Sequence, residues 1–230
     1  MASSPTTEKV IPYTLLGMTG VTGLVDAVSF LSLGHVFTAN MTGNVVLLAF
    51  ATAHVSGLSI ARSLTALVAF LVGAILGGRL MARSSADSQI RFAAQAFLLE
   101  VAFLFAASLC GIGYRGDLLE HSFQPFALIA LTALAMGTRN AAVRKLAIPD
   151  LTTTVLTLTI TGIGADSSLA NGNNPRLARR VASVAAMFLG AALGAVVIHY
   201  SISAVLWLAT AISAVCSAAL FLSVRTSAKL

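Results

Sequence analysis

Long apolar runs dominate this sequence and restrict it to folds that a lipid bilayer can surround. A helix that crosses the hydrocarbon core needs about 20 apolar residues, and five of the runs are long enough. The fifth run along the chain is short but extends toward Val143, and the second and sixth open with irregular, Thr-rich sequence. The eight runs are Val10–Gly34, Phe37–Gly57, Ser63–Met81, Phe92–Gly113, Phe123–Thr138, Leu151–Ala165, Val181–Tyr200 and Ser203–Val224.

The scarcity of charge supports the same conclusion. Only 10% of the residues are charged and 57% are hydrophobic, whereas a soluble domain carries roughly 25% charged residues. A soluble fold needs a polar coat that these side chains cannot supply, but a lipid-embedded fold does not. We therefore expect an all-α, polytopic membrane bundle. No Ala-x-Ala cleavage site follows the first run, so we expect that run to stay as a membrane segment.

The distribution of basic residues predicts the topology. Lys and Arg lie between the apolar runs, which argues against a nucleic-acid partner despite the net charge of +6; in membrane proteins they mark cytoplasmic loops. If the second and sixth runs are broken or re-entrant, the chain crosses six times from an inside N-terminus, with 12 Lys and Arg inside and 2 outside. Eight crossings give 8 against 6, and seven crossings from an outside N-terminus give 11 against 3. Charge favours six crossings over eight and leaves seven open; six is preferred because it treats the two halves of the chain alike.

The two halves of the chain resemble each other, which predicts an internal duplication into two pseudo-symmetric halves. Three crossings per half would orient the halves oppositely, the usual architecture of secondary transporters. The predicted division is an N-terminal tail at 1–9, repeats at 10–113 and 123–224, a loop at 114–122 and a C-terminal tail at 225–230. The matches, at offsets of 114 to 117 residues, pair Asp26-Ala27 with Asn140-Ala141, Thr42-Gly43-Asn44 with Thr157-Leu158-Thr159, Ala61-Arg62 with Ala178-Arg179, and Gly73 and Gly77 with Gly190 and Gly194.

Polar residues inside the apolar runs are the candidate site. Asp26 lies well inside the first run, where a bare carboxylate costs several kcal/mol and usually faces a cavity or a partner. A structural ion pair or an interfacial residue is the alternative. Irregular segments at membrane depth require a protein or water-filled surrounding, although a polar turn would also explain the first of them. The remaining candidates for binding a solute or ion are Asn40, Thr42, Gly43, Asn44, Asn140, Thr152, Thr153, Thr154 and Thr157.

Three further residues have more than one interpretation. Arg139 fits a cytoplasmic anchor, but a pair between Asp26 and Arg139 across the repeat axis is the sharper hypothesis, because their neighbourhoods match. Glu100, halfway along the fourth run, and His35 are reserve candidates for binding a proton or cation. We find no nucleophile elbow, phosphate-binding loop or metal-ligand spacing. We therefore expect no enzyme, no metal and no cofactor.

Two signatures resemble the YoaK family of bacterial inner-membrane proteins, a family defined by a domain of unknown function. The first is Gly23–Leu31 followed by Phe37–Asn44, and the second is Met136–Ala141 followed by Pro149–Thr157. The resemblance spans nearly the whole chain, and Leu158 departs from it where a glycine is expected. It implies a multi-pass protein of the bacterial inner membrane and supplies no activity.

The leading functional interpretation is a transporter or channel-like protein for an unknown small solute or ion, with a polar site near the bilayer midplane. We expect the protein to be surrounded by the lipid bilayer. The sequence leaves open whether it forms a homo-oligomer. The alternative is a membrane scaffold or regulatory partner, although the soluble loops are short. A lipid-modifying enzyme is the third interpretation, and only the polar loop around Arg115 and His121 would suit it.

Overall fold

The fold is a bundle of six long helices with two short helices attached to one side. In the computed structural model, residues 5–85, 88–116 and 123–227 are described. These residues contain helices and no strand. The elements are α1 (Pro5–Ser32), α2 (Met41–Thr52), α3 (Ile60–Ala82), α4 (Gln89–Cys110), α5 (Phe123–Leu146), α6 (Thr157–Ala165), the 3₁₀ helix η1 (Ser168–Ala170), α7 (Leu177–Ile198) and α8 (Ile202–Ser227).

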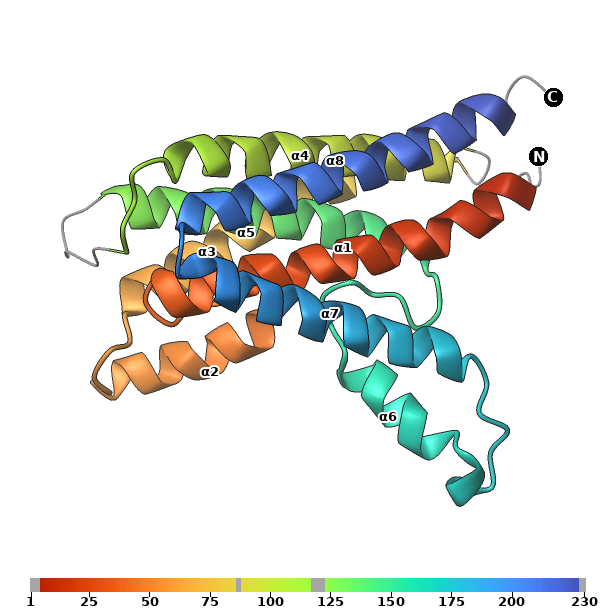
Figure 1. Ribbon diagram of the computed structural model, residues 1–230, viewed down its shortest axis with the longest axis horizontal. Coiled ribbons are helices and arrows are strands. Elements are labelled where there is room, and N and C mark those ends of the chain that lie inside the picture. Colours follow the sequence, from red (N-terminus) through yellow and green to blue (C-terminus); the bar gives the residue numbers. More distant parts are fainter. Residues whose placement is uncertain (1–4, 86–87, 117–122, 228–230) are drawn as a thin grey trace.

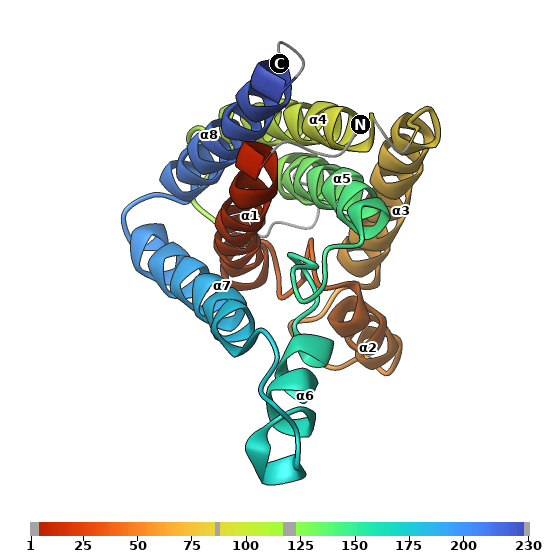
Figure 2. The ribbon, with the colours of Figure 1, turned by 90° about the vertical axis from the view of Figure 1, so that its right-hand side faces the viewer.

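Six of these helices are long and apolar enough to cross a membrane, namely α1, α3, α4, α5, α7 and α8. They lie side by side along the long axis, with α1 and α5 at the centre (Figures 1 and 2). Helix α1 packs on α7 and α8, and α5 packs on α3 and α4. Both chain termini lie at one end, called here the terminal end, and the opposite end is called the far end (Figure 1). The prediction of an all-α polytopic bundle is confirmed.

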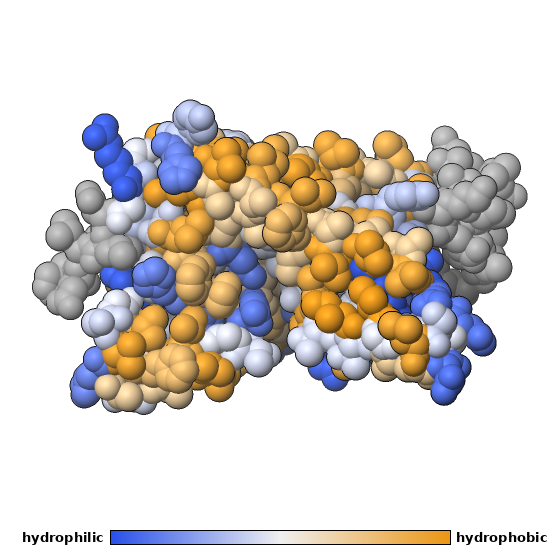
Figure 3. Space-filling model, turned by 60° about the horizontal axis from the view of Figure 1, so that its bottom comes forward, coloured by the Kyte–Doolittle hydropathy of each residue, from blue (hydrophilic) through white to orange (hydrophobic). Residues whose placement is uncertain are grey.

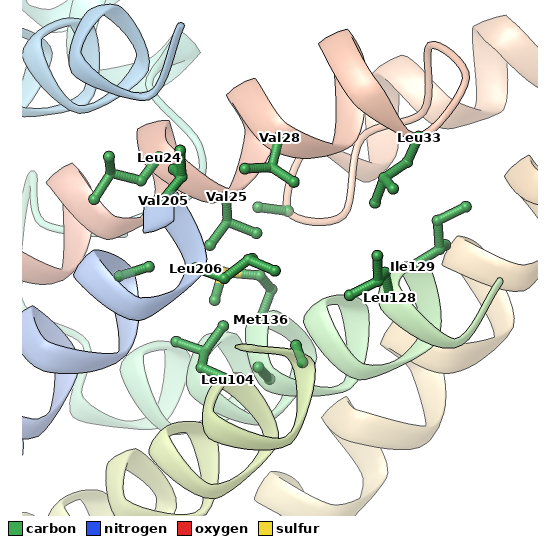
Figure 4. Close-up of a cluster of buried hydrophobic side chains, with 14 of the residues drawn as sticks. Leu24, Val25, Val28, Leu33, Leu104, Leu128, Ile129, Met136, Val205 and Leu206 are labelled. Carbon is green, nitrogen blue, oxygen red and sulfur yellow. The ribbon is translucent and has the colours of Figure 1, made fainter. Parts of the chain in front are cut away.

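A continuous apolar core joins the central helices. Leu24 and Val28 of α1 pack with Leu104 of α4, Met136 of α5 and Leu206 of α8 (Figure 4). All five side chains are buried. A second cluster lies toward the terminal end and contains Leu15, Phe97 and Leu220. These clusters hold α1, α4, α5 and α8 together and leave α3 and α7 at the flanks.

Glycines set the close contacts between the flanking and central helices. A Cβ at Gly190 of α7 would meet the backbone of Gly20 in α1, and one at Gly73 of α3 would meet the backbone of Leu134 in α5. Small residues at such crossings let two helix backbones approach closely. The Gly-x-x-x-Gly motifs therefore pack within one chain.

Helices α2 and α6 are too short to cross. At about 1.5 Å per residue, their 12 and 9 residues span roughly 18 and 14 Å, against a hydrocarbon core of about 30 Å. Among the helices that the structure describes, α2 contacts only α3, and α6 contacts only α7 and η1. Both lie on the same side of the bundle, α2 toward the far end and α6 toward the terminal end (Figure 1). The second and sixth apolar runs are thus broken segments, as predicted.

Candidate functional site

Two non-helical segments enter the bundle and lead into the short helices. Residues 33–40 connect α1 to α2, and residues 147–156 connect α5 to α6. Their central threonines, Thr38 and Thr153, have no exposed surface. Each segment is held by a side chain of the helix before it, so the starting points of α2 and α6 are fixed from within the bundle.

Asp26 holds the first segment. Its Oδ1 accepts hydrogen bonds from the backbone N–H groups of Thr38, at 3.2 Å, and Ala39, at 3.0 Å. Within the described part of the chain, Oδ2 of Asp26 forms no hydrogen bond, and the residue lines a pocket. One carboxylate oxygen, Oδ1, therefore orients the backbone, while the other, Oδ2, remains available to a bound species.

Asn44 has a structural role that the sequence did not reveal. Its side-chain amide donates to the carbonyl oxygen of Phe37, and its Oδ1 accepts from the Phe37 N–H at 2.8 Å. The residue is buried and does not line the pocket. It clamps the turn before α2, so its amide groups are already used by the protein.

Asn140 holds the second segment in a similar way. Its Oδ1 accepts a hydrogen bond from the Thr154 hydroxyl at 3.0 Å. The Thr153 carbonyl accepts another from the Thr22 hydroxyl of α1 at 2.8 Å, and Thr152 donates to the Val155 carbonyl at 2.6 Å. Asp26 and Asn140, matched in the sequence, each tether the segment that precedes a short helix.

The amino-terminal ends of α2 and α6 open onto one pocket of about 540 Å³. Neither helix has a side-chain N-cap hydrogen bond. The first N–H groups of a helix have no acceptor within it and need one from a side chain, water or a ligand. The pocket gathers six of the predicted site residues, which are Asp26, Asn40, Thr42, Gly43, Thr154 and Thr157.

Two further cavities have linings that adjoin this pocket or each other. A cavity of about 360 Å³ shares Val155 with it and is also lined by Asn140 and Thr152. A third, of about 570 Å³, shares Asn140 and Arg144 with the second and includes Lys145. The linings of the three cavities are therefore neighbours and extend from Asp26 to the basic last turn of α5.

The predicted pair between Asp26 and Arg139 is wrong, and so is the assignment of Arg139 as a cytoplasmic anchor. Arg139 Nη1 lies 3.0 Å from Oε1 of Glu100, and neither side chain has exposed surface. Asp26 matches Asn140 rather than Arg139, and adjacent residues of a helix point about 100° apart. Arg139 consequently faces α1 and α4, while Asn140 faces the segment before α6.

Arg139 and Glu100 form a polar centre inside the bundle. Arg139 Nη1 also donates to the Met18 carbonyl at 2.9 Å, and its Nη2 donates to Thr22. Glu100 Oε1 accepts from Ser213 of α8 at 3.3 Å. This centre joins α1, α4, α5 and α8. Glu100, held as a reserve candidate because it had no partner in the sequence, is thus paired, and neither residue lines the pocket.

A second ionic cluster, not anticipated from the sequence, fixes α6 at the terminal end. Arg180 Nε lies 3.0 Å from Asp150 and its Nη2 lies 2.7 Å from Asp166. Its Nη1 donates to the Gly162 carbonyl at 2.5 Å. Arg176 Nε lies 2.7 Å from Asp150. Burial alone would raise the pKa of Asp150, but the hydrogen bonds and charges of the two arginines outweigh it and lower that pKa.

The last reserve candidate, His35, lies outside the pocket. It occupies the turn after α1 with a φ of 55°, is exposed, and its ring contacts Phe30 edge-on. Among the described residues, no three His, Cys, Asp or Glu side chains gather as metal ligands would. The candidate site is therefore the pocket between α2 and α6.

Comparison with known proteins agrees with this architecture. Residues 14–219 match a family described as "Protein of unknown function (DUF1275)". The chain is 37% identical over 156 residues to the UPF0700 transmembrane protein YoaK of Bacillus subtilis (strain 168), a match that covers 67% of each chain. No solved structure matches.

Proposed function

On the premise that this chain belongs to the DUF1275 family and is a multi-pass membrane protein, we propose that it moves a small polar solute or ion across the bacterial cytoplasmic membrane. The observation that carries the proposal is the pocket between the uncapped amino-terminal ends of α2 and α6. In transporters, broken helices that end near the midplane form the binding site. Non-helical backbone at that depth is stable only against protein or water.

The packing of the helices supports an inverted repeat, which is the second part of the proposal. Helix α1 packs on α7 and α8 as α5 packs on α3 and α4, and α2 contacts α3 as α6 contacts α7. The close contacts correspond as well. A Cβ at Gly23 would meet the Met187 carbonyl, and a Cβ at Gly137 would meet the Phe70 carbonyl. Two oppositely oriented halves around one site can alternate its access between the two sides.

We assign to Asp26 the binding of a proton or cation during transport. Its Oδ1 is held by two backbone N–H groups, while the residue lines the pocket. A carboxylate at this depth favours a proton, a metal cation or an amine as its counter-charge. Asp26→Asn keeps an oxygen that can accept both hydrogen bonds but removes the charge, so it separates charge from structure.

Flux into proteoliposomes tests the proposal. Urea, glycerol, methylammonium and formate serve as probes, each followed by light scattering after an osmotic step. We expect wild-type protein to pass at least one probe faster than protein-free liposomes do. Thr42→Trp, which fills the pocket, should abolish that flux, whereas Val68→Trp on the exposed face of α3 should keep it. Equal fluxes through wild type and Thr42→Trp would contradict a pathway through this pocket.

A further inference from the structure

A cavity between α3 and α5, called here the α3–α5 groove, lies outside the pocket that contains Asp26. Its volume is about 570 Å³, and none of its lining residues lines that pocket. The groove is therefore separate from the proposed transport site. Its lining includes Phe70, Ala74 and Gly78 of α3 and Ala141, Arg144 and Lys145 of α5.

The character of the α3–α5 groove changes along its length. Phe70 lies near the middle of α3 and Gly78 lies nearer its end, a distance of roughly 12 Å at about 1.5 Å per residue. Arg144 and Lys145 lie in the last turn of α5, at the terminal end. On the side of the molecule shown in Figure 3, hydrophobic residues likewise give way to hydrophilic ones at the terminal end. The groove is thus apolar at mid-depth and cationic at the membrane surface.

The two cations of the groove have no acidic partner. Among the residues that the structure describes, neither Arg144 nor Lys145 forms an ion pair, and the lining contains no Asp or Glu. Arg176 and Arg180, at the same end, both pair with Asp150. Basic residues concentrate at this end, which the positive-inside rule assigns to the cytoplasm. Basic pockets between spanning helices on that side bind anionic headgroups, so the groove has the charge that such a ligand needs.

The floor of the groove has room for an apolar chain. A Cβ at Gly78 would meet nothing within 4 Å, and Ala74 and Ala141 present only methyl groups. Asn140 also lines the groove, but its Oδ1 already accepts a hydrogen bond from Thr154 at 3.0 Å. Beyond the two cations, the groove therefore offers a ligand mainly van der Waals contact with apolar atoms.

We propose that the α3–α5 groove binds an anionic phospholipid of the cytoplasmic leaflet. Its phosphate lies between Arg144 and Lys145, and one acyl chain runs along α3 toward Phe70. An arginine holds a phosphate through two parallel hydrogen bonds, and a lysine adds a compact charge. A free phosphate ion would occupy only the cationic end and leave the apolar length empty. The inference goes beyond transport, because it concerns a groove to which the proposed function gives no role.

Native mass spectrometry of the purified, delipidated chain tests the site. The chain is titrated in detergent micelles with phosphatidylglycerol, which is anionic, and with phosphatidylcholine, which is zwitterionic. We expect one phosphatidylglycerol to bind more tightly than phosphatidylcholine does. Removing one basic residue beside a lipid headgroup weakens binding by about fivefold. Arg144→Gln/Lys145→Gln should therefore lower the affinity for phosphatidylglycerol by about 30-fold.

The matched control removes two other positive charges from the same end. Arg91 of α4 and Arg225 of α8 are exposed and do not line the groove. Arg91→Gln/Arg225→Gln should leave the affinity for phosphatidylglycerol nearly unchanged. Equal losses in the two double variants would mean diffuse attraction to the basic end and would overturn the site. Equal binding of the two lipids to wild type would overturn it as well.

A variant of the groove floor tests the place of the acyl chain. Gly78→Leu puts a side chain into open space and leaves Arg144 and Lys145 unchanged. We expect it to weaken the binding of phosphatidylglycerol, and we expect inorganic phosphate at equal concentration not to displace the lipid from wild type. Unchanged lipid binding by Gly78→Leu, or displacement by inorganic phosphate, would mean that the two cations hold a free anion. Either result would overturn a lipid site.

The lipid content of the native protein provides a measurement that needs no variant. Wild-type chain extracted gently from its membrane should retain one anionic phospholipid per chain. Retention of zwitterionic lipid alone, or of no lipid, would overturn the proposal. None of these experiments measures flux, so the lipid site and the proposed function fail separately.

Discussion

Removing one member of the Glu100–Arg139 pair should destabilise the bundle far more than removing both. The two side chains lie 3.0 Å apart with no exposed surface. Glu100→Gln would leave the Arg139 guanidinium charged and without its counter-ion. Such an uncompensated buried charge costs about 3–5 kcal/mol, whereas replacing both partners by apolar residues of similar size is often neutral. We therefore expect a loss of about 3–5 kcal/mol in Glu100→Gln and much less in Glu100→Leu/Arg139→Met.

Trp207 provides the assay, because it is the single tryptophan of the chain. Its ring meets Phe105 edge-on, with 5.4 Å between the ring centroids, so its fluorescence reports the separation of α8 from α4. Unfolding by sodium dodecyl sulfate in mixed micelles gives the free energy of unfolding for wild type, both single variants and the double variant. The difference between the double variant and the sum of the singles is the coupling energy.

Two results would refute this account of the polar centre. A loss below about 1 kcal/mol in Glu100→Gln would show that Arg139 does not depend on that carboxylate. A double variant that loses as much as both singles together would show that the two residues act independently.

The helix packing, the ionic cluster around Arg180 and the membrane topology can each be tested separately. Gly190→Leu should cost about 1–3 kcal/mol, because its Cβ would meet the Gly20 backbone, while Gly78→Leu should cost little, since nothing lies within 4 Å of its Cβ; unfolding in micelles compares them. Asp150 has a lowered pKa, so its contribution to stability is complete above the unfolded-state pKa of about 3.9 and is lost as pH falls through the folded-state pKa. The stability advantage of wild type over Asp150→Asn should thus be constant between about pH 7 and pH 5 and disappear at more acid pH. Cysteines at Ser59 and Asn171 should react with an impermeant reagent from opposite sides of the membrane; reaction from the same side would contradict six crossings.

Most of the fold was predictable from the sequence, because hydrophobic length alone identifies a spanning helix. The two exceptional runs were also recognisable, since their polar openings interrupt the apolar pattern. The predicted boundaries of the helices were less accurate than their number. The sequence placed a run from Phe37, but α2 begins at Met41. The residues between them form hydrogen bonds with Asp26 and Asn44, which local sequence patterns do not encode.

The candidate site was predicted in part for the same reason. Asp26, Thr42 and Thr157 line the pocket, because irregular polar segments at membrane depth gather around a cavity. The roles of Asn44 and Arg139 depended on contacts between distant segments. The sequence suggested Asp26 as the partner of Arg139, whereas the Arg139 side chain points toward α4 and pairs with Glu100.

The ionic cluster around Arg180 has a recognisable pattern in the sequence. Asp150 and Asp166 flank a broken segment, and arginines precede the next run. Acidic residues on both sides of a re-entrant helix, followed by arginines, are a pattern that could indicate how such a helix is anchored.

The amino-terminal ends of α2 and α6 meet at one pocket, and we expect water to reach that pocket within the membrane. Single cysteines at Thr42 and Thr157, both in the pocket lining, test it through their rate of reaction with a small, charged methanethiosulfonate in proteoliposomes, because the thiolate that reacts forms only where water reaches. The comparison is Val68→Cys, exposed on the spanning helix α3, where lipid should protect the thiol. We expect rapid reaction at both pocket positions and almost none at position 68. Protection of all three thiols to the same degree would contradict it.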